Sequence, residues 1–226
     1  MILFHNYHIM YGISGIKEQD KLEQLPLFNK KTAQILIGKS NGNLDKKIER
    51  LLKSGYLINL KKGCYVSKLF LDKQTDIKNY TEYLANRLRS PSYLSLDYAL
   101  FKYNLIPEAI NSWTSITTKS TRSYQNNVGV FNYKSIKNNL FTGYNEIKSD
   151  GYNIYLASKA KALFDFLYLK RNLGSNLSFE LNNGLRINWS VFLETDLKEF
   201  TKYVQISDSK KMNSILKIIK EVKNVS

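Results

Sequence analysis

The sequence predicts a protein of the α+β class, built as two domains over residues 1–70 and 71–226. Apolar residues recur at helical spacing between residues 32 and 54, and strand patterns bounded by glycine follow at 56–67 and 112–156. Helical patterns return after residue 158. Helices and strands grouped in separate blocks are typical of the α+β class, and 43% hydrophobic residues are enough to bury a core.

Positive charge is concentrated in one short part of the chain. The net charge is +15, and residues 30–68 alone hold ten basic and two acidic residues, a net charge of +8. The much longer segment 69–226 carries the same excess, with 22 basic and 14 acidic residues. Lysine outnumbers arginine 28 to 6, as expected from an A/T-rich genome, so local density is more informative than total charge. The density favours a polyanionic partner, with nucleic acid ahead of an anionic membrane.

Several classes of protein are excluded by what the sequence lacks. Cys64 is the single cysteine, so we expect no disulfide within the chain, no zinc site built on cysteines and a reducing, cytoplasmic environment. No apolar run is long enough to span a membrane, and the N-terminus has no basic region or cleavage site of a signal peptide. His5 and His8 have no third ligand nearby, so we expect no metal.

The basic segment has the order of elements expected of a DNA-binding domain. A first helix is predicted from Ser14 to Leu25, where Pro26 ends it, and a short second helix from Thr32 to Ile37. Residues 38–40 then form a turn with glycine at the helix C-terminus. Asn41 or Asn43 is expected to cap a third helix that runs to about Ser54.

The third predicted helix is amphipathic. Leu44, Ile48, Leu51 and Leu52 share one face. Lys46, Arg50 and Lys53 fall on the opposite face, with Asn43 and Lys47 at its flank.

A β-hairpin is predicted directly after this helix. Strands at 56–60 and 64–67 flank a turn formed by Lys61, Lys62 and Gly63. A charged helix face or a basic hairpin is by itself usually just solvated. Their order here, however, predicts an N-terminal winged helix-turn-helix followed by a mixed α/β C-terminal domain. The predicted DNA-binding residues are Lys30, Lys31, Lys39, Ser40, Asn41, Asn43, Lys46, Lys47, Arg50, Lys53, Lys61 and Lys62.

The second domain is predicted to place a sheet among helices. Residues 69–75 are expected to form a connector. Helices are predicted at 76–89, 96–103, 158–169, 191–197 and 209–222, and strands at 112–118, 128–133, 140–144 and 152–156.

A series of short motifs in this domain resembles the AbiEi-type antitoxins of type IV toxin–antitoxin systems. The motifs are Ser95–Leu100, Leu105–Glu108, Thr114–Thr118 before Arg122, Gly129–Tyr133, Phe141–Tyr144, and Lys161–Asp165 with Leu167 and Tyr168. Their order and spacing, rather than any single motif, carry the resemblance, which extends from the winged helix to about residue 170. Members often have Pro-Glu-Lys-Ala before the last helix. Here only Lys161 and Ala162 of that stretch remain, which puts an antitoxin role of the glutamate in doubt.

The resemblance implies two functions for one chain. The winged helix would bind repeats of double-stranded DNA in the promoter of its own operon and repress it, as a monomer or through weak cooperative assembly. The C-terminal domain would neutralise a nucleotidyltransferase-like toxin, with direct contact not required, in a system of the kind that serves phage defence. An alternative is a winged-helix regulator with no toxin partner.

A second alternative is a metal-dependent nuclease. Glu146 and Lys148 have the Glu-x-Lys spacing with which some nucleases hold Mg²⁺ and activate water. The strand predicted before them ends at Tyr144, and both histidines lie within the first eight residues. We therefore expect no catalytic residues and no cofactor, and we expect Asp97, Arg122, Asp165 and Tyr168 to be structural.

Overall fold

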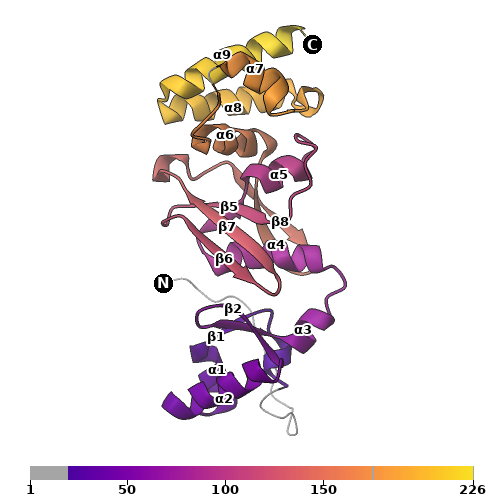
Figure 1. Cartoon of the computed structure of the whole chain (residues 1–226), viewed down its shortest axis with the longest axis vertical. Helices are drawn as coiled ribbons and strands as arrows, with labels where there is room; N and C mark the ends of the chain where they lie inside the picture. The colour runs from indigo at the N-terminus through magenta and orange to yellow at the C-terminus, as the bar shows by residue number, and fades with distance from the viewer. Residues whose placement is uncertain (1–19, 175, 226) are drawn as a thin grey trace. The chain divides into compact units, whose positions relative to one another are not determined.

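The computed structural model describes residues 20–174 and 176–225, which form a mixed α+β protein (Figure 1). The chain divides into two compact units, Met1–Gln74 and Thr75–Ser226. The division lies four residues beyond the expected boundary because helix α3 (Lys68–Asp72) packs against strand β3 of the first unit. A connector was expected here, but the Ser67 hydroxyl accepts a hydrogen bond from the Phe70 backbone N (2.9 Å) and begins a helix.

Two helices of the first unit lie where the sequence predicts them. Helix α1 (Lys30–Ile37) begins two residues early because the Asn29 side chain accepts a hydrogen bond from the Thr32 backbone N at 2.9 Å. Helix α2 (Asn41–Lys53) begins after Ser40, so neither Asn41 nor Asn43 is the cap. Ser40 makes no capping hydrogen bond through its side chain.

The helix predicted from Ser14 to Leu25 was wrong in the part that the structure describes. Its residues 14–19 lie outside the described part of the chain. The remainder is only a 3₁₀ turn, η1 (Leu22–Gln24). Leu25 is extended (φ −96°, ψ 127°), as steric contact with the ring of Pro26 favours.

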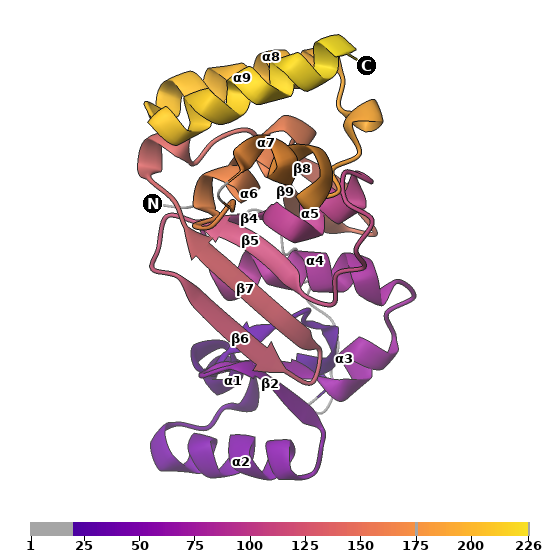
Figure 2. The same ribbon diagram turned by 45° about the horizontal axis from the view of Figure 1, so that its top comes forward.

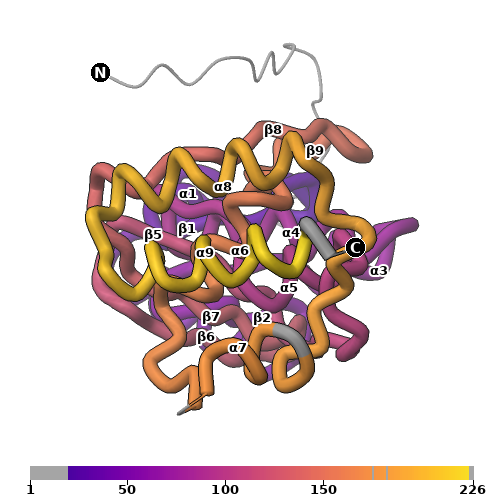
Figure 3. The backbone as a smooth tube through the Cα atoms, turned by 90° about the horizontal axis from the view of Figure 1, so that it is seen from above, coloured from indigo at the N-terminus to yellow at the C-terminus, as the bar shows by residue number. Residues whose placement is uncertain are grey.

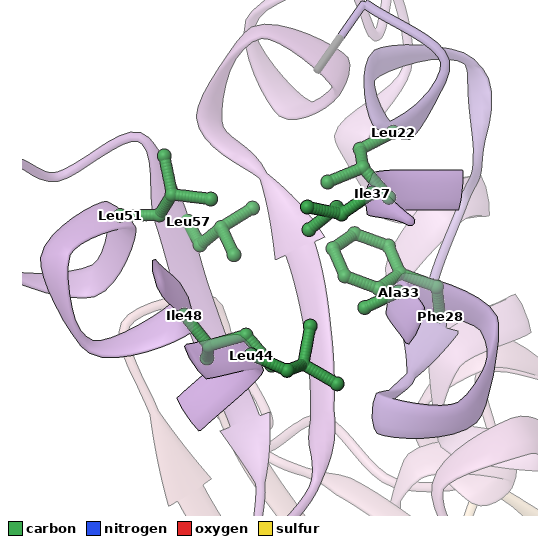
Figure 4. Close-up of a cluster of buried hydrophobic side chains, with 8 residues drawn as sticks. All are labelled: Leu22, Phe28, Ala33, Ile37, Leu44, Ile48, Leu51 and Leu57. Atoms are coloured by element: carbon green, nitrogen blue, oxygen red, sulfur yellow. The ribbon is translucent and has the colours of Figure 1, made fainter. Parts of the chain in front are cut away.

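A three-stranded sheet closes the first unit. Strands β2 (Leu57–Lys61) and β3 (Cys64–Ser67) form the expected hairpin, and the unexpected strand β1 (Phe28–Asn29) pairs with β3. The apolar faces of α1, α2 and the sheet meet in one core (Figure 4). Its buried residues are Leu22, Phe28, Ala33, Ile37, Leu44, Ile48, Leu51 and Leu57.

The second unit is built on one six-stranded mixed sheet of order β6-β7-β5-β4-β9-β8 (Figure 2). The pairs β4–β9 and β5–β7 are parallel, and the other neighbours are antiparallel. The strands are β4 (Ser92–Leu94), β5 (Trp113–Thr117), β6 (Arg122–Asn126), β7 (Gly129–Ser135), β8 (Tyr144–Ser149) and β9 (Tyr152–Ala157).

Helices cover both faces of this sheet. On β4, the Ser92 hydroxyl contacts backbone oxygens of α4 (Ile77–Leu88), whereas the Tyr93 hydroxyl reaches α6 (Lys159–Leu169). Because successive side chains of a strand point to opposite faces, α4 and α6 lie on opposite sides. Helix α8 (Glu194–Ser207) packs on α6, and α9 (Lys210–Val225) runs alongside α8 (Figure 3). The remaining helical segments are α5 (Leu96–Lys102), η2 (Asn138–Leu140), α7 (Leu177–Phe179), η3 (Glu180–Gly184) and η4 (Trp189–Val191).

Two predictions for the second unit were wrong, and strands β4 and β6 were not predicted. Strand β6 lacks the apolar alternation of a half-buried strand, because its residues are mostly polar and exposed. The strand expected at 140–144 lies at Tyr144–Ser149 instead, and the helix expected at 191–197 begins only at Glu194 and runs to Ser207. Within the described residues, no helix has the length and apolar character to cross a membrane.

Candidate nucleic-acid interface

A tight turn joins the two helices that carry the predicted DNA-binding residues. Gly38 adopts the left-handed conformation (φ 67°), and its backbone N donates to the Gln34 oxygen at 3.0 Å. Glycine has no Cβ to clash in this conformation, so the chain can reverse direction directly after α1. Only Lys39 and Ser40 separate this glycine from the start of α2.

The exposed surface of α2 separates into a basic and an acidic stripe. Leu44, Ile48 and Leu51 fill the core, and the remaining residues lie to either side of them. Successive residues are turned by about 100° around a helix. Asn43, Lys46, Lys47 and Arg50 therefore share one side, and Asp45 and Glu49 share the other. Lys53 lies at the boundary, nearly in line with Lys46 but paired with Glu49.

The acidic stripe neutralises two of the predicted DNA contacts. Lys30 Nζ lies 2.6 Å from Asp45 Oδ1, and Lys53 Nζ lies 2.7 Å from Glu49 Oε1. The hydrogen bond from Lys53 lowers the pKa of the Glu49 carboxyl. Lys30 and Lys53 thus differ from the lysines of the basic stripe, because each lies next to a carboxylate that would repel phosphate.

The basic stripe and the turn enclose an open groove of about 330 Å³, here called the basic groove. Lys39, Lys46, Lys47 and Arg50 form no ion pair with a carboxylate in the described part of the chain. Four cations and the amide of Asn43 thus converge on one surface without a neutralising acid. The groove is lined by Gly38, Lys39, Ser40, Asn43, Lys46, Lys47 and Arg50.

A second depression, of about 390 Å³, continues from the turn along α1. It shares residues 38–40 with the basic groove and adds Lys31, Gln34 and Ile35. The sequence prediction included Lys31 but missed Gln34 and Ile35. Their helical positions, away from the core residues Ala33 and Ile37, were the signal that could have identified them.

The remaining predicted contacts lie at the hairpin and at the start of α2. Lys62 is exposed and Lys61 half-buried, in a turn where Gly63 has φ of 73°. Asn41 is exposed with φ of 49°, and it does not line the basic groove.

In the second unit, the motifs that carry the family resemblance converge on one buried set of side chains. Asp165 accepts hydrogen bonds from the hydroxyls of Tyr93 (3.0 Å) and Ser95 (2.8 Å), and from the ammonium group of Lys161. Lys161 and Asp165 have no exposed side-chain surface. We call Tyr93, Ser95, Lys161 and Asp165 the buried network. The expectation that Asp165 is structural agrees with this burial.

Aromatic rings surround the ammonium group of Lys161. Its Nζ lies 5.0 Å from the ring centre of Phe164, 5.4 Å from that of Tyr203 and 5.7 Å from that of Tyr93. Desolvation lowers the pKa of Lys161 and raises the pKa of Asp165, because burial favours the neutral form of each. The ion pair and the hydroxyl hydrogen bonds act against this cost.

Over the residues that it describes, the structure shows no cluster of metal ligands of the kind that the nuclease alternative requires. Glu146 and Lys148 lie on β8, an edge strand, with both side chains exposed. Asp97 lines a separate cavity of about 480 Å³ that neither of them lines. Among the described residues, no group of three or more His, Cys, Asp or Glu side chains could hold a metal ion. His5 and His8 lie outside those residues.

The other residues expected to be structural have modest roles. Tyr168 stacks on Phe164, with ring centres 5.4 Å apart, and the exposed Arg122 lies over the ring of Tyr124 at 5.7 Å.

In comparisons with known proteins, no family model matches this chain and no curated protein matches it.

Proposed function

We propose that the chain is a sequence-specific, DNA-binding transcriptional repressor whose first unit is a winged helix-turn-helix. Helix α2 is then the recognition helix, and the β2–β3 hairpin is the wing. The observation that supports this most strongly is the basic groove, where four cations without carboxylate partners surround an exposed asparagine on α2.

Each residue type in the groove matches a chemical group of duplex DNA. Lysine and arginine neutralise phosphates, which supplies most of the affinity and makes it dependent on salt. Arginine can donate two hydrogen bonds to guanine, and asparagine can pair with adenine in the major groove. Arg50 and Asn43 are therefore the side chains proposed to read bases, and Lys39, Lys46 and Lys47 those proposed to contact the backbone.

The segregation of charge on α2 orients the helix on DNA. The acidic stripe would face away from the duplex, because Asp45 and Glu49 would be repelled by phosphate. Lys30 and Lys53 would contribute little, since their carboxylate partners offset their charge.

For the second unit we propose the antitoxin function implied by the AbiEi resemblance, with a nucleotidyltransferase-like toxin as the functional partner. Support comes from the motifs that are similar to that family. Four of their residues, Ser95, Gly143, Lys161 and Asp165, lie in or against the buried network. These residues lie far apart in sequence, and the fold brings them together.

The decisive experiment is binding of the purified chain to the DNA upstream of its own gene and to a scrambled duplex, at two salt concentrations. We expect a preference of about 10³-fold or more for the upstream DNA, with affinity that falls steeply as salt rises. Equal, weak binding to both duplexes would contradict sequence-specific repression.

Two lysines of α2 provide a matched pair of variants. Lys46→Ala removes an unpaired cation from the basic groove and should weaken binding, whereas Lys53→Ala removes one that Glu49 already offsets and should leave affinity nearly unchanged. Equal losses would contradict the proposal that pairing with Glu49 keeps Lys53 from contributing to binding.

The antitoxin proposal is tested by co-expression with the product of the adjacent gene. Growth should be rescued by the wild type and by the double variant Lys46→Ala and Lys47→Ala, which no longer represses. If only repression-competent chains rescue growth, the second unit has no antitoxin function of its own.

A further inference from the structure

Helix α1 exposes an isoleucine beside the proposed DNA-binding surface. The side chain of Ile35 is 72% exposed, the largest exposed fraction among the large hydrophobic residues that the structure describes. We infer that Ile35 contacts thymine methyl groups in the major groove, so that the protein favours A·T pairs next to the bases met by α2. This inference rests on the proposed DNA-binding function.

The position of Ile35 on the helix explains its exposure. Helix α1 packs against the core through Ala33 and Ile37, on either side of Ile35 in sequence. At about 100° per residue, Ile35 points to the opposite side of the helix from both. It contributes nothing to the core of the first unit.

The surroundings of Ile35 indicate what covers it. It lies in the depression formed with Lys31, Gln34, Lys39 and Ser40, which shares residues 38–40 with the basic groove. A polyanion bound in the groove would therefore extend over the depression. A second copy of this chain docked on the same surface would instead place Lys31 and Lys39 next to the same lysines of that copy, where the like charges repel.

An A·T pair offers the chemistry that matches this depression. The C5-methyl of thymine is the apolar group displayed on base edges in the major groove, and isoleucine can bury it. The adenine of the same pair displays an acceptor and a donor that an amide such as Gln34 can match. Lys31 and Lys39 supply charge for the neighbouring phosphates.

The test compares upstream DNA containing thymine with the same fragment made with deoxyuridine, which differs only by lacking the methyl groups. For each methyl contacted by Ile35, wild-type affinity should fall about fourfold, corresponding to about 0.8 kcal/mol for one buried carbon group. The affinities of Ile35→Ala for the two fragments should differ less than those of the wild type, because the contact with the methyl groups is lost. Leu69→Ala is the matched control, because Leu69 is 43% exposed on α3 and lines neither the depression nor the basic groove.

The outcomes separate this inference from the function on which it rests. If Ile35→Ala discriminates between the two fragments as strongly as the wild type does, the inference is overturned while repression stands. An equal loss on both fragments, with loss of cooperative assembly, would instead assign Ile35 to a protein contact. Absence of any preference for upstream over scrambled DNA would overturn the proposed function itself.

Discussion

Lysine is central to two regions of this molecule, in opposite environments. In the basic groove, Lys39, Lys46 and Lys47 are hydrated and face no carboxylate. In the buried network, Lys161 is sealed among aromatic rings and held by Asp165. The groove holds charge available for a partner, and the network holds charge that is fully compensated within the fold.

The difference shows how burial changes what a charge does. An exposed lysine retains its hydration, so it adds little to stability and remains free to bind phosphate. A buried lysine has lost its hydration, so it is tolerated only with a carboxylate and well-placed hydrogen bonds. Substitutions in the groove should therefore change binding, and substitutions in the network should change stability.

The largest expected effect follows removal of one partner of the buried pair. Lys161→Met leaves the Asp165 carboxylate buried without its cation and should destabilise the second unit by about 3–5 kcal/mol. Adding Asp165→Asn should restore much of the loss, because the amide oxygen can still accept from Tyr93 and Ser95. Both tryptophans, Trp113 and Trp189, lie in this unit, so denaturant unfolding followed by tryptophan fluorescence reports on it. A loss below about 1 kcal/mol in the single variant would show that the pair is dispensable.

A smaller effect is expected from crowding the network. Gly143 has φ of 76°, and a Cβ there would lie 2.2 Å from the hydroxyl of Tyr203. Gly151 has φ of 79°, but a Cβ there would have no neighbour within 4 Å. Both alanine variants suffer the same backbone strain, so Gly143→Ala should be less stable than Gly151→Ala by about 1–3 kcal/mol of overpacking. Equal stabilities in the same fluorescence assay would mean that Tyr203 moves aside at no cost.

In the groove, Arg50→Ala should weaken binding to the specific site without changing stability. If Arg50 makes two hydrogen bonds to guanine, the variant should lose about 1–3 kcal/mol of binding and accept other bases at that position. Its free energy of unfolding should stay within about 0.5 kcal/mol of the wild type, as for most surface substitutions. Binding titrations with single-base operator variants measure the first effect. An equal loss on random DNA would indicate a phosphate contact instead.

The smallest effect is expected at the hairpin. Lys62→Ala should reduce the slope of log affinity against log salt by about 0.9, the value for one lost phosphate contact. The loss should be the same on specific and scrambled DNA, because a backbone contact carries no sequence information. An unchanged slope would place the hairpin tip away from the duplex.

The first unit could be predicted largely because its signals are local. The apolar spacing of Leu44, Ile48 and Leu51 defines a helix within four turns, and the turn at Gly63 joins strands that adjoin in sequence. The sequence did not predict which cations line the basic groove and which, like Lys30 and Lys53, are paired with a carboxylate. This pairing depends on which carboxylate each lysine reaches, and Asp45 meets Lys30 from another helix.

The errors lie where structure depends on partners distant in sequence. Strands β1 and β6 are short or polar and exist because a neighbouring strand supplies their hydrogen bonds. Strand β8 begins only at Tyr144, where pairing with Ala157 of β9 begins. The strand was placed at 140–144 because of Leu140, Phe141 and Tyr144, but apolar and aromatic character alone does not reveal the pairing.

By itself, the sequence determined the α+β class, the order of α1, α2 and the hairpin in the first unit, and the concentration of positive charge between residues 30 and 68, because each depends on local periodicity or composition. The tertiary structure alone decided which cations remain unpaired, that Ile35 faces outward beside them, and that Ser95, Lys161 and Asp165 meet in the interior. Hydration and pairing are set by distances between residues far apart in the chain. The sequence therefore does not reveal that Lys161 is buried, whereas the fold encloses it beside Asp165 and leaves Lys47 without a carboxylate partner.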